Sequence, residues 1–262
     1  MSALETLILG IVQGLTEFLP VSSSGHLELV KAIFGSDYEK QQSLLITITL
    51  HAGTAFSTLF VFRKDIALIL SDLMILKKGE RLNFSKKIVL SMIPAVFIGL
   101  FFEDFIASLF DGKIALVGIM LMITALLLYW ADRVNENNKE LSYGNAFSIG
   151  LIQAIAILPG ISRSGATIAL GVLLKIDRDK AARFSFLMVI PLILGSIVKS
   201  ILDGNLTQES TELFPLLIGF LGAFFTGVFA CHWMIALVKK SKLKYFSFYC
   251  IMVGGLAILY SL

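Results

Sequence analysis

The sequence has 262 residues, a formal net charge of +3 at pH 7 and a mean hydropathy of +0.85; 56% of its residues are hydrophobic and 16% are charged. Ordinary soluble domains carry about 25% charged residues, and a soluble chain could not cover this much apolar surface. Composition therefore excludes a soluble globular protein and indicates an integral membrane protein. The basic residues belong to loops, so no nucleic-acid partner is expected. Cys231 and Cys250 lie in apolar stretches, which predicts buried packing residues rather than a disulfide or a zinc site.

Six apolar runs are long enough, or nearly so, to cross a bilayer, for which a helix needs about 20 apolar residues. In chain order the predicted crossings are 43–62, 87–102, 113–131, 183–202, 213–238 and 245–262. The second run is short and contains Pro94, but membrane helices tolerate proline because neighbouring groups satisfy the freed backbone. The sequence therefore predicts an all-α integral membrane protein with six transmembrane helices.

Four other apolar segments are too short or too interrupted to cross: 3–19, 24–34, 143–157 and 164–174. The last covers roughly 16 Å at about 1.5 Å per residue, or about half the hydrocarbon core. Helix-breaking residues separate the members of each pair, Pro20 in the first and Pro159 in the second. We therefore expect two re-entrant helical hairpins, 3–34 and 143–174, with tips at mid-membrane. Irregular backbone at that depth must be buried in protein or line a wet cavity.

The two hairpins are similar in sequence. The stretch GIVQ at residues 10–13 matches GLIQ at residues 150–153, a spacing of 140 positions. The chain thus divides into halves 1–140 and 141–262, each with one hairpin and three crossings. Because three is an odd number, the second half is inverted relative to the first. Such inverted-topology repeats place their sites near the midplane, where the repeats meet.

The charged loops predict the orientation of the chain in the membrane. Lysine and arginine are concentrated in 63–87 and 239–244, whereas the charges of 103–112 and 203–212 are all acidic. By the positive-inside rule, the basic segments are cytoplasmic and the acidic ones face outward. The first hairpin then enters from outside and the second from the cytoplasm, so that both tips meet at the centre.

Both helix breaks carry serine and glycine next to a half-helix, in PVSSSGHL (residues 20–27) and LPGISRSGATI (residues 158–168). Serine is a good N-cap, and a helix start offers free N–H groups and a partial positive charge that suit phosphate. Arg163 adds a cation whose fork matches phosphate oxygens. It needs such a partner because burying it in a membrane costs about 2.5–3.5 kcal/mol. The candidate phosphate-binding residues are therefore Ser22, Ser24, Gly25, Ser162, Arg163 and Ser164.

The first tip adds groups for metal binding and proton transfer. Glu17 lies one turn after Gln13, so both face the same side of their helix. A carboxylate, a glutamine oxygen and phosphate oxygens can hold a hard divalent cation such as Mg²⁺ or Ca²⁺. His26 can act as a general base or, less readily, as a nucleophile, and the hydroxyls of Ser22 and Ser23 are near enough in sequence to be activated by it. These residues predict a phosphate-binding, metal-assisted site inside the bilayer.

Each of these residues also has a structural interpretation. Glu17 could be a solvated helix end, a serine run could be only a cap, and His26 could be a hydrogen-bonded packing residue. His51 and His232 lie on crossing runs and are expected to be structural. The functional interpretation is favoured because several polar groups that are costly to bury converge at one depth.

Two stretches carry a resemblance to a known family: QGLTEFLPVSSSGH at residues 13–26 and LPGISRSGAT at residues 158–167. They resemble the two signatures of bacterial undecaprenyl-diphosphatase, the bacitracin-resistance membrane family, and the similarity extends over the whole chain in length, hydropathy and layout. The resemblance implies an enzyme of the bacterial cytoplasmic (inner) membrane that depends on a divalent cation. In the orientation that the loop charges predict, its lipid substrate would reach the site from the outer side. The resemblance implies removal of the terminal phosphate of undecaprenyl diphosphate, which yields inorganic phosphate and undecaprenyl phosphate, the lipid carrier for peptidoglycan synthesis.

The resemblance also assigns roles to residues. Its catalytic positions fall on Glu17, Ser23, His26 and Arg163, and its polar positions around the phosphates include Thr167 together with Ser22 and Ser162. Gln13 stands where the family has its first acidic residue. Because an amide is a weaker metal ligand than a carboxylate, a two-carboxylate site is not expected here. The nucleophile is left open between water, Ser23 and His26.

Two other functional classes are alternatives to the phosphatase interpretation. Inverted repeats with broken helices are typical of transporters, so the same site could carry a polyprenyl phosphate across the membrane. A non-catalytic scaffold in contact with membrane lipids is the third class, and it leaves the burial of Glu17, His26 and Arg163 unexplained. The sequence leaves open the oligomeric state, a homo-oligomer included, the preferred cation and the tolerance for shorter prenyl chains.

Overall fold

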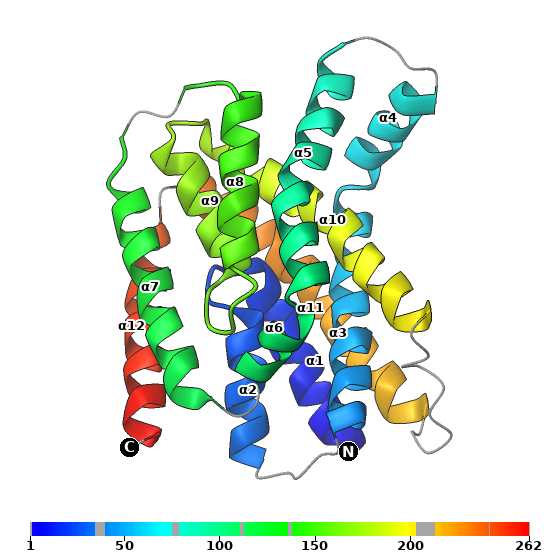
Figure 1. Cartoon of the computed structure of the whole chain (residues 1–262), viewed down its shortest axis with the longest axis vertical. Helices are drawn as coiled ribbons and strands as arrows, with labels where there is room; N and C mark the ends of the chain where they lie inside the picture. Colours follow the sequence, from blue (N-terminus) through cyan, green and yellow to red (C-terminus); the bar gives the residue numbers. More distant parts are fainter. Residues whose placement is uncertain are drawn as a thin grey trace.

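A computed structural model of the chain describes residues 2–34, 40–74, 79–110, 113–135, 138–202, 213–240 and 242–261. Within these ranges the chain forms α-helices and no β-strand (Figure 1), which confirms the predicted all-α class. The helices are α1 (Ala3–Phe18), α2 (Ser23–Phe34), α3 (Lys40–Val61), α4 (Arg63–Met74), α5 (Glu80–Phe101), α6 (Glu103–Leu109), α7 (Ile114–Asp132), α8 (Tyr143–Ile155), α9 (Arg163–Leu173), α10 (Arg178–Leu202), α11 (Leu213–Lys239) and α12 (Leu243–Tyr260).

Five of the described helices are long and apolar enough to cross a membrane, namely α5, α7, α10, α11 and α12. A sixth span results if Leu45–Val61 of α3 and Arg63–Asp72 of α4, which are bent by 76°, count as one. Large apolar side chains face outward from these helices; Phe225 and Leu256, for example, are 65% and 61% exposed. Apolar surface of this extent suits a lipid environment. The chain is therefore a multi-pass helical membrane protein.

Two of the observed helices begin well before the apolar runs that predicted them. α5 begins at Glu80 and α10 at Arg178, several residues before the predicted crossings 87–102 and 183–202. Hydropathy detects only the apolar part of a helix and therefore misses the polar turns at its ends.

α4 and α6 occupy segments that were expected to be loops. Both are short and mix charged with apolar residues, so they produce no continuous apolar run. Lys77 and Lys78 of the first basic segment, and the acidic segment 203–212, lie outside the described residues.

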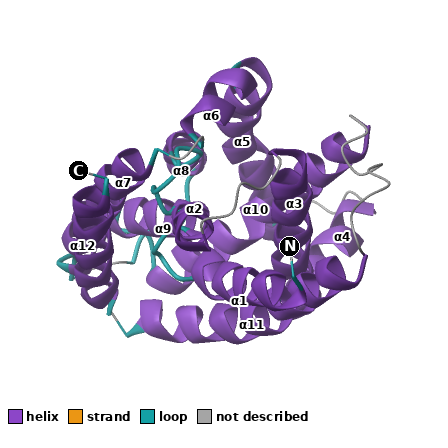
Figure 2. Cartoon of the chain, turned by 90° about the horizontal axis from the view of Figure 1, so that it is seen from below, coloured by secondary structure: helices purple, strands orange, loops and turns teal. Residues whose placement is uncertain are grey.

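The structure contains both predicted helix pairs, α1 with α2 and α8 with α9. α1 ends at Phe18, just before Pro20, whereas α8 ends at Ile155, a turn earlier than Pro159 requires. In Figure 1 the pair α1–α2 occupies the lower half of the molecule and the pair α8–α9 the upper half, and their tips meet near mid-height. Figure 2 shows α2 and α9 near the centre, with the longer helices around them.

The first helix of each pair packs closely on a long helix from the other half of the chain, α1 on α11 and α8 on α5. Glycine makes both contacts possible. A Cβ atom on Gly10 would lie 2.3 Å from the Gly219 carbonyl oxygen, and one on Gly150 would lie 2.3 Å from the Ser91 carbonyl oxygen. α7 and α12 pack on each other in the same manner at Gly118 and Gly254. Small residues are the usual means of bringing membrane helices together.

The main apolar core lies between α7, α9, α10, α11 and α12 and reaches the first tip. Phe18, at the end of α1, packs edge-on against Phe186 of α10 with ring centroids 5.8 Å apart. Cys231 and Cys250 are free thiols with no exposed surface, so the prediction that they are buried packing residues is confirmed.

We predict that Gly10→Ala lowers the thermal unfolding midpoint of the detergent-solubilised protein, because the new methyl group would force α1 away from α11. Overpacking of this kind costs about 1–3 kcal/mol. Gly99→Ala in α5 is the matched control, since a Cβ atom there meets nothing within 4 Å. If the two variants unfold at the same temperature, the close contact between α1 and α11 is wrong.

Candidate active site

The site lies where the two tips touch. Glu17 at the end of α1 forms an ion pair with Arg163 at the start of α9, and their side chains are only 8% and 15% exposed. The backbones also meet, because a Cβ atom on Gly25 would lie 3.1 Å from the Cα atom of Gly160. Ser164 donates a hydrogen bond to the Leu19 carbonyl across the same contact, at 3.3 Å. Residues from both hairpins thus form one buried polar site.

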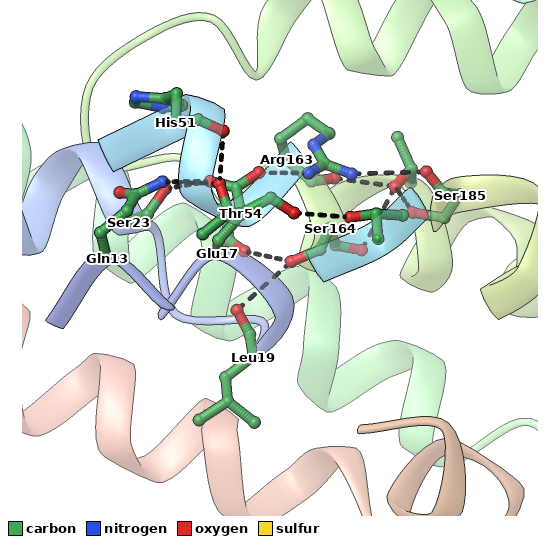
Figure 3. A network of polar contacts seen from close by, with 12 residues as sticks. Gln13, Glu17, Leu19, Ser23, His51, Thr54, Arg163, Ser164 and Ser185 are labelled. Carbon is green, nitrogen blue, oxygen red and sulfur yellow. Dashed lines mark hydrogen bonds and ion pairs between the residues drawn. The ribbon is translucent and has the colours of Figure 1, made fainter. Parts of the chain in front are cut away.

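The carboxylate of Glu17 is the centre of the polar network in Figure 3. One oxygen pairs with Arg163, and the other accepts hydrogen bonds from Ser23 Oγ at 2.7 Å and from Gln13 Nε2 at 3.1 Å. A buried charge is tolerated only when it is paired and hydrogen-bonded. The solvated helix end considered for Glu17 is therefore wrong, since the side chain is enclosed and both of its oxygens have polar partners.

The side-chain amide of Gln13 donates a hydrogen bond to Glu17, while its own oxygen accepts none from the described residues. Its Nε2 also lies 3.5 Å from Thr54 Oγ1 of α3, while its Oε1 is buried and finds no partner among the described residues. Within the same residues, no three His, Cys, Asp or Glu side chains cluster as they would in a preformed metal centre. Glu17 and Gln13 fit a hard cation by donor type, but other ligands would have to complete its shell.

Arg163 is held from its far side by α10. Its Nη1 donates to the Ser185 carbonyl at 3.3 Å, and Ser185 Oγ lies 2.6 Å from Thr167 Oγ1 (Figure 3). Thr167 also donates to the Arg163 carbonyl, at 2.8 Å. Thr167 was expected near the phosphates and lies behind Arg163, with no exposed surface. Sequence reasoning missed Ser185, because a lone serine in an apolar crossing gives no local signal.

The serines of the two tips repeat one arrangement. Ser162 caps α9 by accepting from the Gly165 N–H at 3.0 Å, and Ser22 accepts from the Gly25 N–H at 3.2 Å. Each of these serines also lies 3.3 Å, hydroxyl to hydroxyl, from the serine two positions on, Ser164 and Ser24. The caps expected from the sequence are thus present. Ser22 has φ 70°, a left-handed conformation that is costly for serine and that persists only where the surrounding structure holds it.

His26 is held by partners other than the expected ones. Its Nδ1 lies 2.8 Å from the Ser22 carbonyl and its Nε2 lies 2.8 Å from the hydroxyl of Tyr249 on α12. The Ser23 hydroxyl donates to Glu17 instead. The structure thus gives His26 and Ser23, which were expected to interact, different partners. His26 turns toward α12, and that direction depends on a helix from the other half of the chain.

The other two histidines, which were expected to be structural, contact the backbone of their own helices. His51 Nδ1 lies 2.8 Å from the Thr47 carbonyl, and His232 Nδ1 lies 2.9 Å from the Val228 carbonyl. Thr54 adds a link that sequence reasoning missed, because its hydroxyl donates to the His51 carbonyl at 3.0 Å and lies beside Gln13.

The chain is similar over its whole length to known proteins. The family model described as bacitracin resistance protein BacA matches residues 6–256. The chain belongs to this family. A protein of Christiangramia forsetii named undecaprenyl-diphosphatase is 56% identical over 261 residues, which cover 100% of this chain and 99% of that protein. Proteins with the same name from Bacteroides fragilis and Alkaliphilus metalliredigens are 44% and 40% identical, over 98% and 100% of this chain and 97% and 100% of their own lengths.

We predict that Glu17→Gln and Arg163→Gln each lower the unfolding midpoint in detergent, because each leaves the opposite charge buried without its partner. Breaking a buried ion pair costs about 3–5 kcal/mol. The double variant should lose at least about 1 kcal/mol less than the sum of the single losses, since it buries neither charge. Strictly additive losses would mean that the two side chains do not interact.

Proposed function

We propose that this member of the BacA family hydrolyses undecaprenyl diphosphate to undecaprenyl phosphate and inorganic phosphate at the site between the two tips. The observation that carries the proposal is the buried pair of Glu17 and Arg163, which unites a carboxylate and an anion-binding cation inside a lipid-facing helical bundle. Relatives that match essentially the whole chain are named undecaprenyl-diphosphatase.

The two helix pairs are, in this proposal, re-entrant hairpins, and the halves 1–140 and 141–262 are inverted repeats. In support, the pairs lie at opposite ends of the molecule with their tips together (Figure 1). Gly10 and Gly150, which correspond in the repeat, make the same close contact with a long helix of the other half. The site then lies near the membrane midplane.

The orientation follows from the basic segments. Lys239 at the end of α11 pairs with Asp179 at 3.1 Å, and Arg183 pairs with Asp65 of α4 at 3.4 Å. The end of α11, the start of α10 and α4 therefore share one end of the bundle, which we assign to the cytoplasm by the positive-inside rule. The first hairpin then enters from the outer side of the bacterial inner membrane, and the diphosphate reaches the site from that side.

The chemistry follows from the charges and donors at the tips. Arg163 donates one hydrogen bond to Glu17 and one to the Ser185 carbonyl. Its remaining N–H groups are available to phosphate oxygens. The starts of α2 and α9 add the partial positive charge of two helix ends. Phosphoryl transfer depends mainly on such positioning and electrostatic stabilisation. A divalent cation held by the oxygens of Glu17 and Gln13 would offset the charge that develops on the phosphate.

Proton transfer centres on Glu17 and Ser23. The Ser23 hydroxyl already donates to the Glu17 carboxylate, which makes Glu17 the acceptor for a proton released at that position. Attack by water on the terminal phosphorus forms a new P–O bond and breaks the bond to the bridging oxygen, which yields inorganic phosphate and undecaprenyl phosphate. If Ser23 or His26 attacks instead, undecaprenyl phosphate leaves first, and water then releases the phosphate from that side chain. Labelled phosphate trapped on quenched protein distinguishes a phosphorylated Ser23 or His26 from direct attack by water.

A transporter of polyprenyl phosphates is the second candidate, because hairpins that meet from opposite ends are also a transporter arrangement. We predict that purified protein in detergent, where no compartments exist, releases phosphate from undecaprenyl diphosphate. A chelator should lower the rate about tenfold or more, and added Mg²⁺ or Ca²⁺ should restore it. Absence of phosphate release in detergent with either cation present would exclude the phosphatase.

We further predict that Arg163→Ala lowers the rate of phosphate release by about 100-fold or more, the usual loss when a charge-stabilising donor is removed. The variant is compared at a temperature at which size-exclusion chromatography shows it folded and monodisperse. Arg183→Ala is the matched control, since Arg183 is 45% exposed and pairs away from the tips. Near-normal turnover by the Arg163 variant would contradict the proposal that Arg163 binds the phosphate during transfer.

A further inference from the structure

The imidazole of His26 is held at both ring nitrogens by groups from opposite halves of the chain. Its Nδ1 contacts the Ser22 carbonyl, within its own hairpin, and its Nε2 contacts the hydroxyl of Tyr249, 223 positions further along. Both distances are 2.8 Å, and His26 is 8% exposed.

The partners decide which nitrogen carries the proton. A carbonyl oxygen only accepts hydrogen bonds, so neutral His26 donates from Nδ1 to Ser22. Nε2 is then the basic nitrogen, and its lone pair accepts a hydrogen bond from the Tyr249 hydroxyl. The tautomer of His26 is thus set by one backbone group of the first tip and one side chain of α12.

Packing alone does not explain the hydroxyl of Tyr249. The two rings are nearly parallel, at 10°, with centroids 5.6 Å apart, and the neighbouring Cys250 sulfur lies 3.7 Å from the Pro20 carbonyl. A phenylalanine would fill the same space on this outward face, where the Tyr249 residue is 37% exposed. In an apolar setting an unbonded hydroxyl is unfavourable, so its bond to His26 accounts for it.

The second tip is also held by a side chain from a long helix. There, Thr124 of α7 donates to the Gly160 carbonyl at 3.2 Å and accepts from the Ser162 N–H at 3.0 Å. Since α7 and α12 pack on each other, this helix pair holds both tips from one side. Thr124 forms hydrogen bonds only with backbone groups, which indicates a structural role. Tyr249 instead forms its hydrogen bond with a titratable side chain.

We propose that Tyr249 is a positioning residue for His26. Its hydroxyl fixes the tautomer and the ring orientation, so that Nδ1–H stays on the Ser22 carbonyl and holds the first tip in place for phosphate transfer. Tyr249 acts through His26 and not on the substrate. The catalytic consequence rests on the proposed phosphatase function, but the hydrogen bond itself does not.

The hydrogen bond is tested without any substrate. The protein contains three histidines, so ¹⁵N-histidine labelling in detergent gives a spectrum that His26→Ala can assign. Tyr249→Phe should move the His26 Nε2 resonance, because it removes the donor and keeps the ring. Tyr245→Phe on the same helix, at a residue that is 60% exposed, should leave it unchanged. An unmoved His26 resonance in Tyr249→Phe overturns the proposal whether or not the protein is a phosphatase.

The positioning role is tested by kinetics with undecaprenyl diphosphate. Tyr249→Phe should lower kcat about tenfold, the equivalent of one hydrogen bond, with KM unchanged. Tyr249→Leu, which also removes the ring, should lose about as much, because the hydroxyl carries the effect. Full activity in the phenylalanine variant with a loss in the leucine variant would show a packing role and overturn the proposal. A wild-type protein without phosphate release would instead contradict the proposed function and leave the spectroscopic result standing.

Discussion

The ion pair between Glu17 and Arg163 is the interaction on which the rest of the structure depends. Each charge is enclosed in a bundle of apolar helices, where an unpaired ion would cost several kcal/mol. The pair is favourable only when both tips are in register and the remaining polar atoms find partners. Ser23 and Gln13 supply these partners for the carboxylate, and the Ser185 carbonyl supplies one for the guanidinium. The site therefore places strict demands on the packing of both hairpins.

Close backbone contacts keep the tips in register. Gly10 and Gly150 let the first helix of each pair lie directly against a helix of the other half. At the second tip, Gly160 has φ 97° and would place a Cβ atom 2.4 Å from the Val117 carbonyl oxygen. No other residue fits there without moving α7. Because protein interiors are close-packed, such contacts hold the polar groups at fixed positions before any substrate arrives.

The two helix pairs, although similar in sequence, carry different charged residues at their tips. Ser23 and Arg163 stand at corresponding positions, 140 residues apart, and both bind Glu17. The position 140 residues after Glu17 is Ile157. Gln153, the counterpart of Gln13, accordingly has no carboxylate to bind, and its amide atoms find no partner among the described residues. The first hairpin thus brings the acid and the second brings the cation.

The sequence by itself determined the membrane class, the helix breaks and the residues at the tips. Polar groups stand out in an apolar chain, and serine, glycine and proline mark helix ends by local chemistry that needs no tertiary contact. Only the tertiary structure showed that Ser23 binds Glu17, that Ser185 supports Arg163 and that Tyr249 holds His26. Ser185 and Tyr249 lie in apolar crossings far from the tips in sequence, and the sequence had indicated His26, not Glu17, as the partner of Ser23. Which side chains meet was decided by how distant helices pack, and local sequence patterns do not encode that choice.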